Sequence, residues 1–343
     1  MAIARPFSTV VNSAHVSGQS CGQAPRTTCR PETGDGSSGM KARQFYWNCA
    51  RPRRALILSA MSGSRTLATV AFADGQRVPV LGLGTWTMGE RAGNAAREIA
   101  ALRAGLDLGM TLIDTAEMYA DGGAEKIVAR AIAGRRDEVF LISKVYPHNA
   151  SAKATIAACE RSLARLATDR LDLYLLHWRG RTPLAETVSA FERLRRAGKI
   201  VRWGVSNFDV DDIEELLALP DGARCAANQV LYNLGERGIE WRLRALCHQH
   251  GIRIIAYSPL GQGALLTRRK LATLAASYKL TPAQLALAWL LAQREVIAIP
   301  QSSSVSHVAE CRAAADVRLP PEALAAVDAA FPPPRRARPL AML

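Results

Sequence analysis

The stretch Thr111-Leu-Ile-Asp114-Thr-Ala-Glu-Met-Tyr119 places a carboxylate at the end of a short apolar run and a phenol five residues later. Two further apolar runs end in the same manner, one on the ammonium of Lys144 and the next on the imidazole of His177. Core packing does not explain polar side chains at the ends of three successive runs. The pattern is typical of parallel strands whose carboxyl ends gather around an active site.

Apolar runs of strand length recur eight times and alternate with segments of helical period. The expected strands are Val80–Gly84, Thr111–Asp114, Val139–Ser143, Leu171–Leu176, Ile200–Val205, Cys225–Val230, Ile252–Tyr257 and Val296–Ile299. Eight strand–helix units predict an α/β fold, a closed TIM (β/α)8 barrel. The alternative is an open doubly wound sheet, but the glycine loops at Gly82–Gly84 and Gly261–Gly263 both lack the third glycine of a dinucleotide fingerprint.

Local signals fix several other elements. Residues 69–80 predict an N-terminal β-hairpin with an Asp74-Gly75 turn. Helices are expected over 154–166 and over 183–197, where Gly198 is a helix stop. Thr281 followed by proline predicts the capped start of another helix.

The chain divides into three parts. Residues 1–60 lack helical or strand periodicity and contain eight basic and two acidic side chains. Three interpretations stay open: an upstream stretch with Met61 as the true start, which we favour; a transit peptide; or a disordered arm. Residues 61–334 form the expected barrel, and residues 335–343 a short basic tail. Deletion of residues 1–60 is expected to leave folding unchanged.

Composition excludes several classes of protein. The net charge of +14 is concentrated in residues 1–60 and the tail, without an aromatic-plus-basic stripe, so nucleic-acid binding is not expected. No apolar run reaches the roughly 18 residues of a membrane span. Seven cysteines without framework spacing indicate buried thiols rather than disulfides, and Cys247-His-Gln-His250 has no second ligand pair for a metal site. A cytoplasmic protein is expected.

The four polar residues suggest proton-transfer chemistry. A free phenol has a pKa of about 10, which is high for a proton donor at neutral pH. The ammonium of Lys144, held charged by Asp114, is expected to lower the pKa of Tyr119. His177 is expected to donate a hydrogen bond to a substrate carbonyl. No metal is needed for this chemistry.

The chain from about residue 66 to 334 resembles the aldo-keto reductase family. The motifs that carry the resemblance are Gly82-Leu-Gly-Thr-Trp86, Asp114-Thr-Ala-Glu-Met-Tyr119, Lys144, His177, Gly204-Val-Ser-Asn207, Asn228-Gln229 and Tyr257-Ser-Pro-Leu-Gly261. The resemblance implies that Asp114, Tyr119, Lys144 and His177 are the catalytic residues. The stretches 114–126 and 143–147 resemble a bacterial branch of the family that reduces methylglyoxal and other small aldehydes.

The same resemblance implies a nicotinamide cofactor. Residues expected to bind it are Gly84, Thr85, Ser206, Asn207, Gln229, Tyr257, Ser258, Leu260, Gln262, Gln301, Ser302, Ser303, Ser304 and His307. Many members have Lys where this chain has Gln301 and Arg where it has His307. NADPH is therefore expected with weaker discrimination against NADH, with Arg312 as a candidate compensating charge.

Trp86, Met118 and Trp178 are expected to line the substrate pocket. The short C-terminus predicts an open, permissive mouth. The expected reaction is transfer of a hydride from NADPH to a small aldehyde or ketone such as methylglyoxal, with diketo-sugar acids as further candidates. The alternative is a cofactor-binding, channel-associated or redox-sensing subunit with residual activity. A monomer or weak oligomer is expected.

Overall fold

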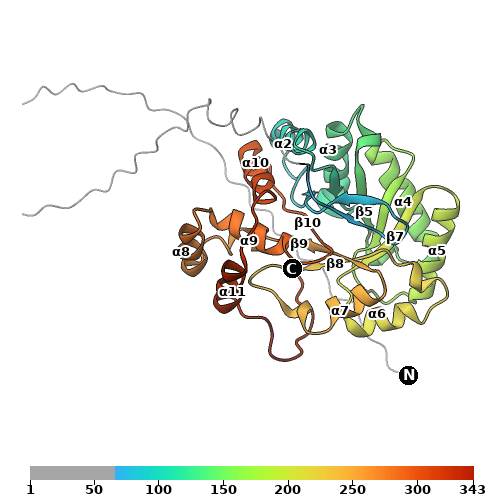
Figure 1. The fold of residues 1–343 in the computed structure, drawn as a ribbon. Coiled ribbons are helices and arrows are strands. Elements are labelled where there is room, and N and C mark those ends of the chain that lie inside the picture. Colours follow the sequence, from blue (N-terminus) through green and yellow to red (C-terminus); the bar gives the residue numbers. More distant parts are fainter. Residues whose placement is uncertain (1–65) are drawn as a thin grey trace, which may run out of the picture. The chain divides into compact units, whose positions relative to one another are not determined.

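Eight parallel strands form the centre of the protein (Figure 1). The structure, a computed structural model, describes residues 66–343, so the predictions for residues 1–60 and Met61 lie outside the described residues. The strands are β3 (Leu83–Gly84), β4 (Leu112–Asp114), β5 (Phe140–Val145), β6 (Leu171–Leu176), β7 (Ile200–Ser206), β8 (Ala227–Leu231), β9 (Arg253–Tyr257) and β10 (Val296–Ala298). Each strand pairs with the next one along the chain.

The sheet closes because its first strand also contacts its last. The N–H of Gly82 donates to the carbonyl oxygen of Ala298, and the N–H of Ala298 donates to that of Val80, both at 2.8 Å. A further parallel bridge joins Gly84 to Gln301. Glycine is required at position 84, since a β-carbon there would lie 2.9 Å from a backbone oxygen. The predicted (β/α)8 barrel is confirmed.

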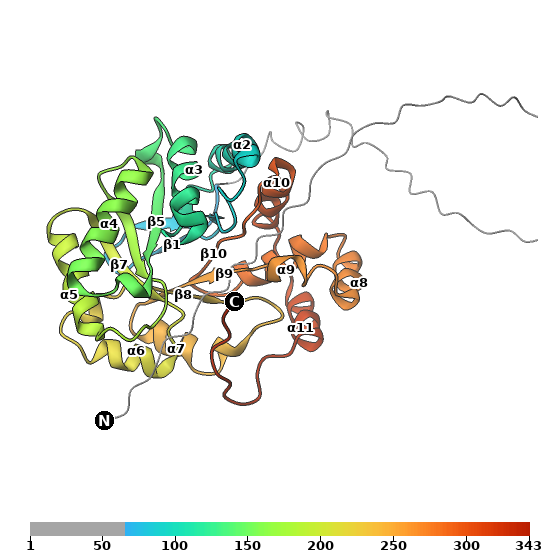
Figure 2. The same ribbon diagram turned by 180° about the vertical axis from the view of Figure 1, so that it is seen from behind.

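Helices surround the barrel on its outside (Figures 1 and 2). They are α2 (Ala95–Asp107), α3 (Gly123–Ala131), α4 (Ala152–Leu166), α5 (Leu184–Arg196), α6 (Val210–Leu217), α7 (Leu243–Gln249), α8 (Arg269–Ser277), α9 (Pro282–Leu291), α10 (Val305–Ala314) and α11 (Pro321–Ala330). The predicted cap of α9 is confirmed, since the Thr281 hydroxyl accepts from the N–H of Gln284 at 3.1 Å. Among residues 66–343, no helix combines the length and the apolar character needed to cross a membrane.

The predicted hairpin, β1 (Thr69–Ala71) and β2 (Arg77–Pro79), covers the amino-terminal end of the barrel. The guanidinium of Arg253, at the start of β9, donates to the carbonyl oxygen of Ala71 at 2.6 Å. The rings of Phe72 and Phe140 stack at 5.4 Å. The hairpin therefore closes this end of the barrel, and the active site is expected at the carboxyl ends of the strands.

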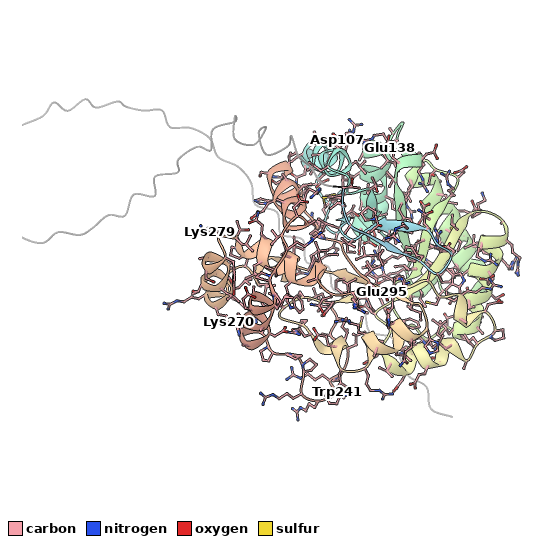
Figure 3. The ribbon with its side chains drawn as sticks, in the orientation of Figure 1. Asp107, Glu138, Trp241, Lys270, Lys279 and Glu295 are labelled. Carbon is pink, nitrogen blue, oxygen red and sulfur yellow. The ribbon has the colours of Figure 1, made fainter. Side chains whose placement is uncertain are left out.

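Stability comes mainly from apolar burial. Side chains of Ile142, Leu175 and Ile255 fill the barrel interior, and a larger core lies between strands and helices. Cys159, Cys225, Cys247 and Cys311 are buried free thiols, as predicted. At the outer surface Arg135 pairs with Asp107 and Glu138 (Figure 3), but exposed pairs contribute only about 0–1 kcal/mol each.

Candidate active site

The four predicted catalytic residues meet at the carboxyl end of the barrel. Asp114 ends β4, Lys144 is the second-last residue of β5, and His177 directly follows β6. Tyr119 opens the short 3-10 turn η2 (Tyr119–Gly122) that follows β4. Adjacent parallel strands end at the same edge, so residues far apart in sequence converge here.

Lys144 is the centre of this group. Its side chain is fully buried, and its Nζ lies 2.7 Å from Asp114 Oδ2, 2.9 Å from the Thr115 carbonyl oxygen and 3.2 Å from Tyr119 Oη. An ammonium has three donors, and these three oxygens use all of them. The phenol oxygen of Tyr119 accepts from Lys144, so its own O–H remains to be donated.

The pKa values of the pair are shifted by burial and by mutual interaction. Burial alone lowers the pKa of Lys144, but the nearby Asp114 carboxylate and the Tyr119 oxygen outweigh it, so the pKa is raised and the ammonium stays charged. Burial raises the pKa of Tyr119, and the charge of Lys144 offsets this only in part. The expectation of a lowered pKa for Tyr119 is therefore wrong, because burial is the larger effect. At neutral pH the phenol keeps its proton.

His177 faces the same cavity in its neutral form. Burial, and then the charge of Lys144, hold the pKa of its imidazole well below the usual range. Its Nδ1 is buried without a hydrogen-bond partner, so Nε2 is the nitrogen that a group in the cavity can reach. The rings of His177 and Tyr119 lie edge to face with centroids 5.7 Å apart. Two neutral proton donors thus lie side by side.

The turn that carries Tyr119 has an unusual backbone. Ala120 and Asp121 both have φ of 50°, and Gly122 has φ of 82°. A β-carbon at Gly122 would collide with the side chain of Arg165, 2.4 Å away. Left-handed residues cost free energy, so surrounding contacts must hold the turn.

Glu125, in the first turn of α3, supplies such contacts. Its carboxylate is fully buried and accepts from Arg165 Nε at 2.5 Å and from Ser143 Oγ at 2.7 Å. Ser143 is adjacent to Lys144 on β5, so Glu125 links the Tyr119 turn to the strand that carries the lysine. Glu125 was not among the predicted site residues, although a carboxylate six residues after Tyr119 is visible in the sequence.

A second wall of the cavity consists of amide and hydroxyl groups from β7 to β9. Gln229 Nε2 donates to Asp114 Oδ1 at 2.7 Å, and Ser206 Oγ donates to the carbonyl oxygen of Gln229 at 2.9 Å. Asn207 has φ of 57°, and its Oδ1 accepts from the hydroxyl of Tyr257 at 2.9 Å. These side chains hold one another in place, and each also faces the cavity.

The cavity at this end has a volume of about 280 Å³. Fifteen predicted residues line it: Gly84, Thr85, Trp86, Asp114, Met118, Tyr119, His177, Trp178, Ser206, Asn207, Gln229, Tyr257, Ser258, Gln262 and Gln301. Ile299, Met342 and Leu343 also line it and were not predicted. The C-terminal segment thus returns to the cavity and borders the mouth that was predicted to be open.

Aromatic side chains form the rim. Trp86 is 47% exposed and Met118 is 39% exposed, although both line the cavity. Trp178 lies edge to face against Tyr146 at 5.1 Å. Glu117 accepts from the N–H of Tyr146 at 2.8 Å and so fixes this part of the rim.

Comparison with known proteins agrees with this geometry. A model of the aldo/keto reductase family matches residues 80–331. The chain belongs to this family. It is 50% identical over 271 residues to methylglyoxal reductase YeaE of Escherichia coli, an alignment that covers 78% of this chain and 95% of that protein. It is 36% identical over 261 residues to glyoxal reductase of Bacillus subtilis, with 76% and 92% covered.

Solved structures give the same result. An aldo-keto reductase from Klebsiella pneumoniae, crystallised in complex with NADPH, is 50% identical and matches with a TM-score of 0.79. The match covers 81% of this chain and all of that one. The eight-stranded barrel with its N-terminal hairpin is therefore the architecture of an aldo-keto reductase.

Five residues expected to bind cofactor in this aldo-keto reductase do not line the cavity: Leu260, Ser302, Ser303, Ser304 and His307. Leu260 lies on the loop after β9, the three serines lie on the loop after β10, and His307 lies in the first turn of α10. Their roles stay predictions. On the first loop, Ser258 and Gln262 have φ of 45° and 53°. Asn233 Nδ2 donates to the carbonyl oxygen of Ser258 at 2.9 Å and supports this conformation.

Arg312 does not suit the role of a compensating charge. Its side chain is buried, and its Nε donates to the carbonyl oxygen of Leu108 at 3.1 Å. Its Nη1 forms an ion pair with Asp316 at 2.8 Å. The bond to Leu108 joins α10 to the end of α2, so Arg312 is a structural residue of this aldo-keto reductase.

Proposed function

We propose that this protein reduces small aldehydes and ketones with NADPH, and that Tyr119 is the proton donor. The observation that carries the proposal is the contact of one buried ammonium with both Asp114 and Tyr119, beside a cavity that His177 also faces. The names of the relatives, a methylglyoxal reductase and a glyoxal reductase, support this substrate class.

The cavity wall fits a nicotinamide cofactor. When bound, NADPH supplies the hydride. Gln229 uses its NH2 group on Asp114, which leaves its Oε1 to accept from a carboxamide. Ser206 and Asn207 stand beside it, and the ring of Tyr257 offers an apolar face for stacking. Ser258 and Gln262 would bind the pyrophosphate, and Gln301, the three following serines and His307 the adenosine end.

The residues of this chain perform two tasks on the carbonyl oxygen. His177 is neutral, so it donates a hydrogen bond from Nε2 and positions the oxygen without transferring charge. Tyr119 delivers its proton to that oxygen as negative charge develops. Lys144 then stabilises the phenolate through the contact it already makes, and Asp114 keeps the lysine charged and oriented.

The size of the cavity favours small substrates. The space of about 280 Å³ is bordered by two indoles at the rim and by Met342 and Leu343 on the tail side. We infer that methylglyoxal and similar short carbonyl compounds fit best, and that diketo-sugar acids are further candidates. Apolar walls with a few polar groups suit such ligands.

The experiment that tests this function measures loss of NADPH absorbance with methylglyoxal, glyoxal and longer ketones, and repeats the series with NADH. We expect turnover that is fastest with the short dicarbonyls and with NADPH. A preference for NADH of tenfold or more in KM would contradict the choice of cofactor. Tight binding of NADPH without turnover of any carbonyl would instead favour the cofactor-binding subunit.

A further inference from the structure

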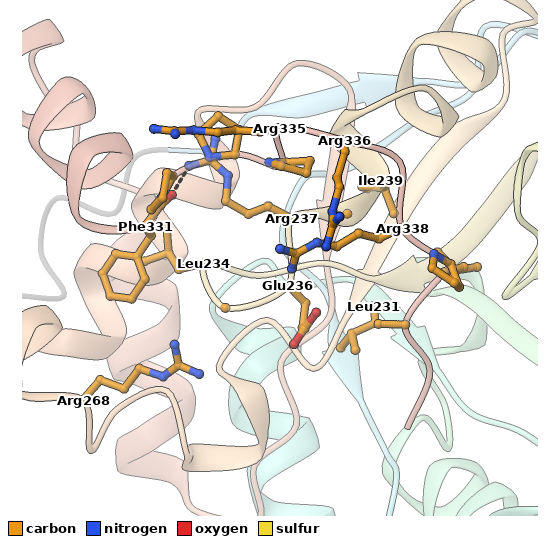
Figure 4. A pocket seen from close by; sticks show the side chains of 18 of the residues that line it. Leu231, Leu234, Glu236, Arg237, Ile239, Arg268, Phe331, Arg335, Arg336 and Arg338 are labelled. Atoms are coloured by element: carbon orange, nitrogen blue, oxygen red, sulfur yellow. Dashed lines mark hydrogen bonds between the residues drawn. The ribbon is translucent and has the colours of Figure 1, made fainter.

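A second hollow lies beside the active site, and its lining is strongly basic (Figure 4). It has a volume of about 430 Å³. One wall is the C-terminal segment 331–341, and the others are the loop after β8 and the segment before α8. We name this hollow the tail groove.

Four guanidinium groups of the tail groove have no ionic partner among residues 66–343: Arg268, Arg335, Arg336 and Arg338. The other two cations of the lining are already engaged. Arg237 pairs with Glu240 and Asp328, both at 2.7 Å, and Lys270 donates to the carbonyl oxygen of Ala330 (Figure 3). Glu236 is the one carboxylate of the lining. The lining of the tail groove thus carries an excess of positive charge.

The tail that carries these arginines is anchored at both ends. The guanidinium of Arg237 donates to the carbonyl oxygen of Phe331 at 2.5 Å, as the dashed line in Figure 4 marks. The N–H of Leu340 donates to Asp209 Oδ2 at 3.1 Å, at the start of α6. Residues 332–334 and residue 339 are prolines, which restrict the backbone between the anchors. A ligand therefore meets arginines on a constrained segment and loses less entropy on binding.

We propose that the tail groove binds a small molecule with two or more phosphate groups. Guanidinium groups bind phosphate through paired, charge-assisted hydrogen bonds. A phosphate monoester carries about −1.5 to −2 charges at neutral pH. Two such groups therefore neutralise the positive charge that remains when the one glutamate is subtracted from the four arginines. Phe331, the aromatic residue of the lining, is buried, so no ring is presented for stacking bases and single-stranded nucleic acid is disfavoured.

Occupancy of the tail groove acts on the active site through the tail itself. Ala341 borders the groove, and the next two residues, Met342 and Leu343, line the carbonyl cavity. A smaller hollow lined by Gln262, Arg268 and Ala341 lies between the two sites. A bound polyphosphate that holds the tail changes the apolar border of the cavity, so it alters the KM for the carbonyl substrate. This last effect rests on the proposed reductase activity, whereas binding does not.

The test uses inorganic tripolyphosphate as the probe and the enzyme saturated with NADPH, so that the phosphate-binding loops of the cofactor site are filled. Calorimetry compares wild type with R336Q/R338Q and with the control R97Q/R196Q, which removes the same charge from exposed arginines on α2 and α5. We expect binding to weaken about tenfold in R336Q/R338Q and to stay unchanged in the control.

Two results overturn the proposal. One is that tripolyphosphate shows no detectable binding to the wild-type holoenzyme. The other is that its binding is weakened equally in both double variants, which would mean that only the net charge of the protein matters. NADPH binding to each variant shows that it is folded. If tripolyphosphate binds as expected but the enzyme reduces no carbonyl compound, the proposed reductase function is wrong and the proposal that the tail groove binds polyphosphate is supported. If binding occurs without a change in KM, the coupling through the tail is wrong.

Discussion

Substitution of Lys144 by methionine separates the structural and chemical roles of the buried ammonium. The variant K144M leaves the Asp114 carboxylate buried with only Gln229 as a side-chain donor. Removing one partner of a buried ion pair costs about 3–5 kcal/mol of the free energy of unfolding, because the other charge stays uncompensated. We expect a fall in Tm of roughly 5–9 °C for a barrel of this size.

The effect of K144M on kcat comes from a different contact, the one between Lys144 and Tyr119. The 3.2 Å contact between Nζ and the phenol oxygen joins two opposite charges only as the proton leaves Tyr119. A hydrogen bond to a charged group contributes about 1.5–3 kcal/mol, so kcat should fall about tenfold to a hundredfold. The double variant K144M/D114N removes the unpaired charge, while an asparagine oxygen can still accept from Gln229. We expect it to be more stable than K144M by at least about 1 kcal/mol and equally slow.

Urea unfolding measures the stability of the three proteins, and NADPH consumption with methylglyoxal measures kcat. A K144M enzyme that turns over as fast as wild type would contradict the role of Lys144 in stabilising the phenolate. A double variant no more stable than K144M would show that the carboxylate is not the source of the loss.

Further predictions concern other parts of the site. The pKa of His177 is depressed in the folded protein, so its contribution to stability is present above the unfolded pKa of about 6.5 and is lost as pH falls from there through the folded pKa. The free energies of unfolding of wild type and H177Q, measured between about pH 8 and pH 5, should therefore converge at the acid end. Parallel curves would contradict this. The variant E125Q, which weakens the support of the Tyr119 turn, should lose about 2 kcal/mol or more of stability and also lower kcat, and unchanged kinetics would exclude a positioning role. The change Q301K/H307R should lower the KM for NADPH about tenfold and leave the KM for NADH unchanged. Initial rates measured against the concentration of each cofactor test this. The variant L343A should lower the KM of long aldehydes relative to methylglyoxal, and an unchanged ratio would mean that the tail does not limit the cavity.

Much of the fold follows from the sequence because buried parallel strands are almost continuously apolar. Each of the eight predicted runs overlaps an observed strand, although β3 keeps only Leu83–Gly84 of the run from Val80 and β5 continues to Val145, two residues beyond its run. The catalytic residues could be predicted for the same reason. Asp114, Lys144 and His177 are polar side chains where an apolar run should end, and the closed barrel brings those ends together.

Other features depend on three-dimensional surroundings that no local pattern encodes. The tail after Phe331 has neither helical nor strand periodicity, so its return to the cavity could not be predicted. The direction of the Tyr119 pKa depends on how deeply the ring is buried, which outweighs the visible lysine. Arg312 was a candidate compensating charge for the cofactor phosphate, but its buried side chain is engaged by Leu108 and Asp316.

The most direct test of the account is the turnover of methylglyoxal and NADPH by Y119F, with Y278F as the control at the end of α8, outside the cavity. We predict that Y119F binds NADPH as wild type does and loses about a hundredfold or more in kcat, because no proton donor of equal reach remains beside His177. Equal kcat values for Y119F, Y278F and wild type would contradict the assignment of Tyr119 as the proton donor.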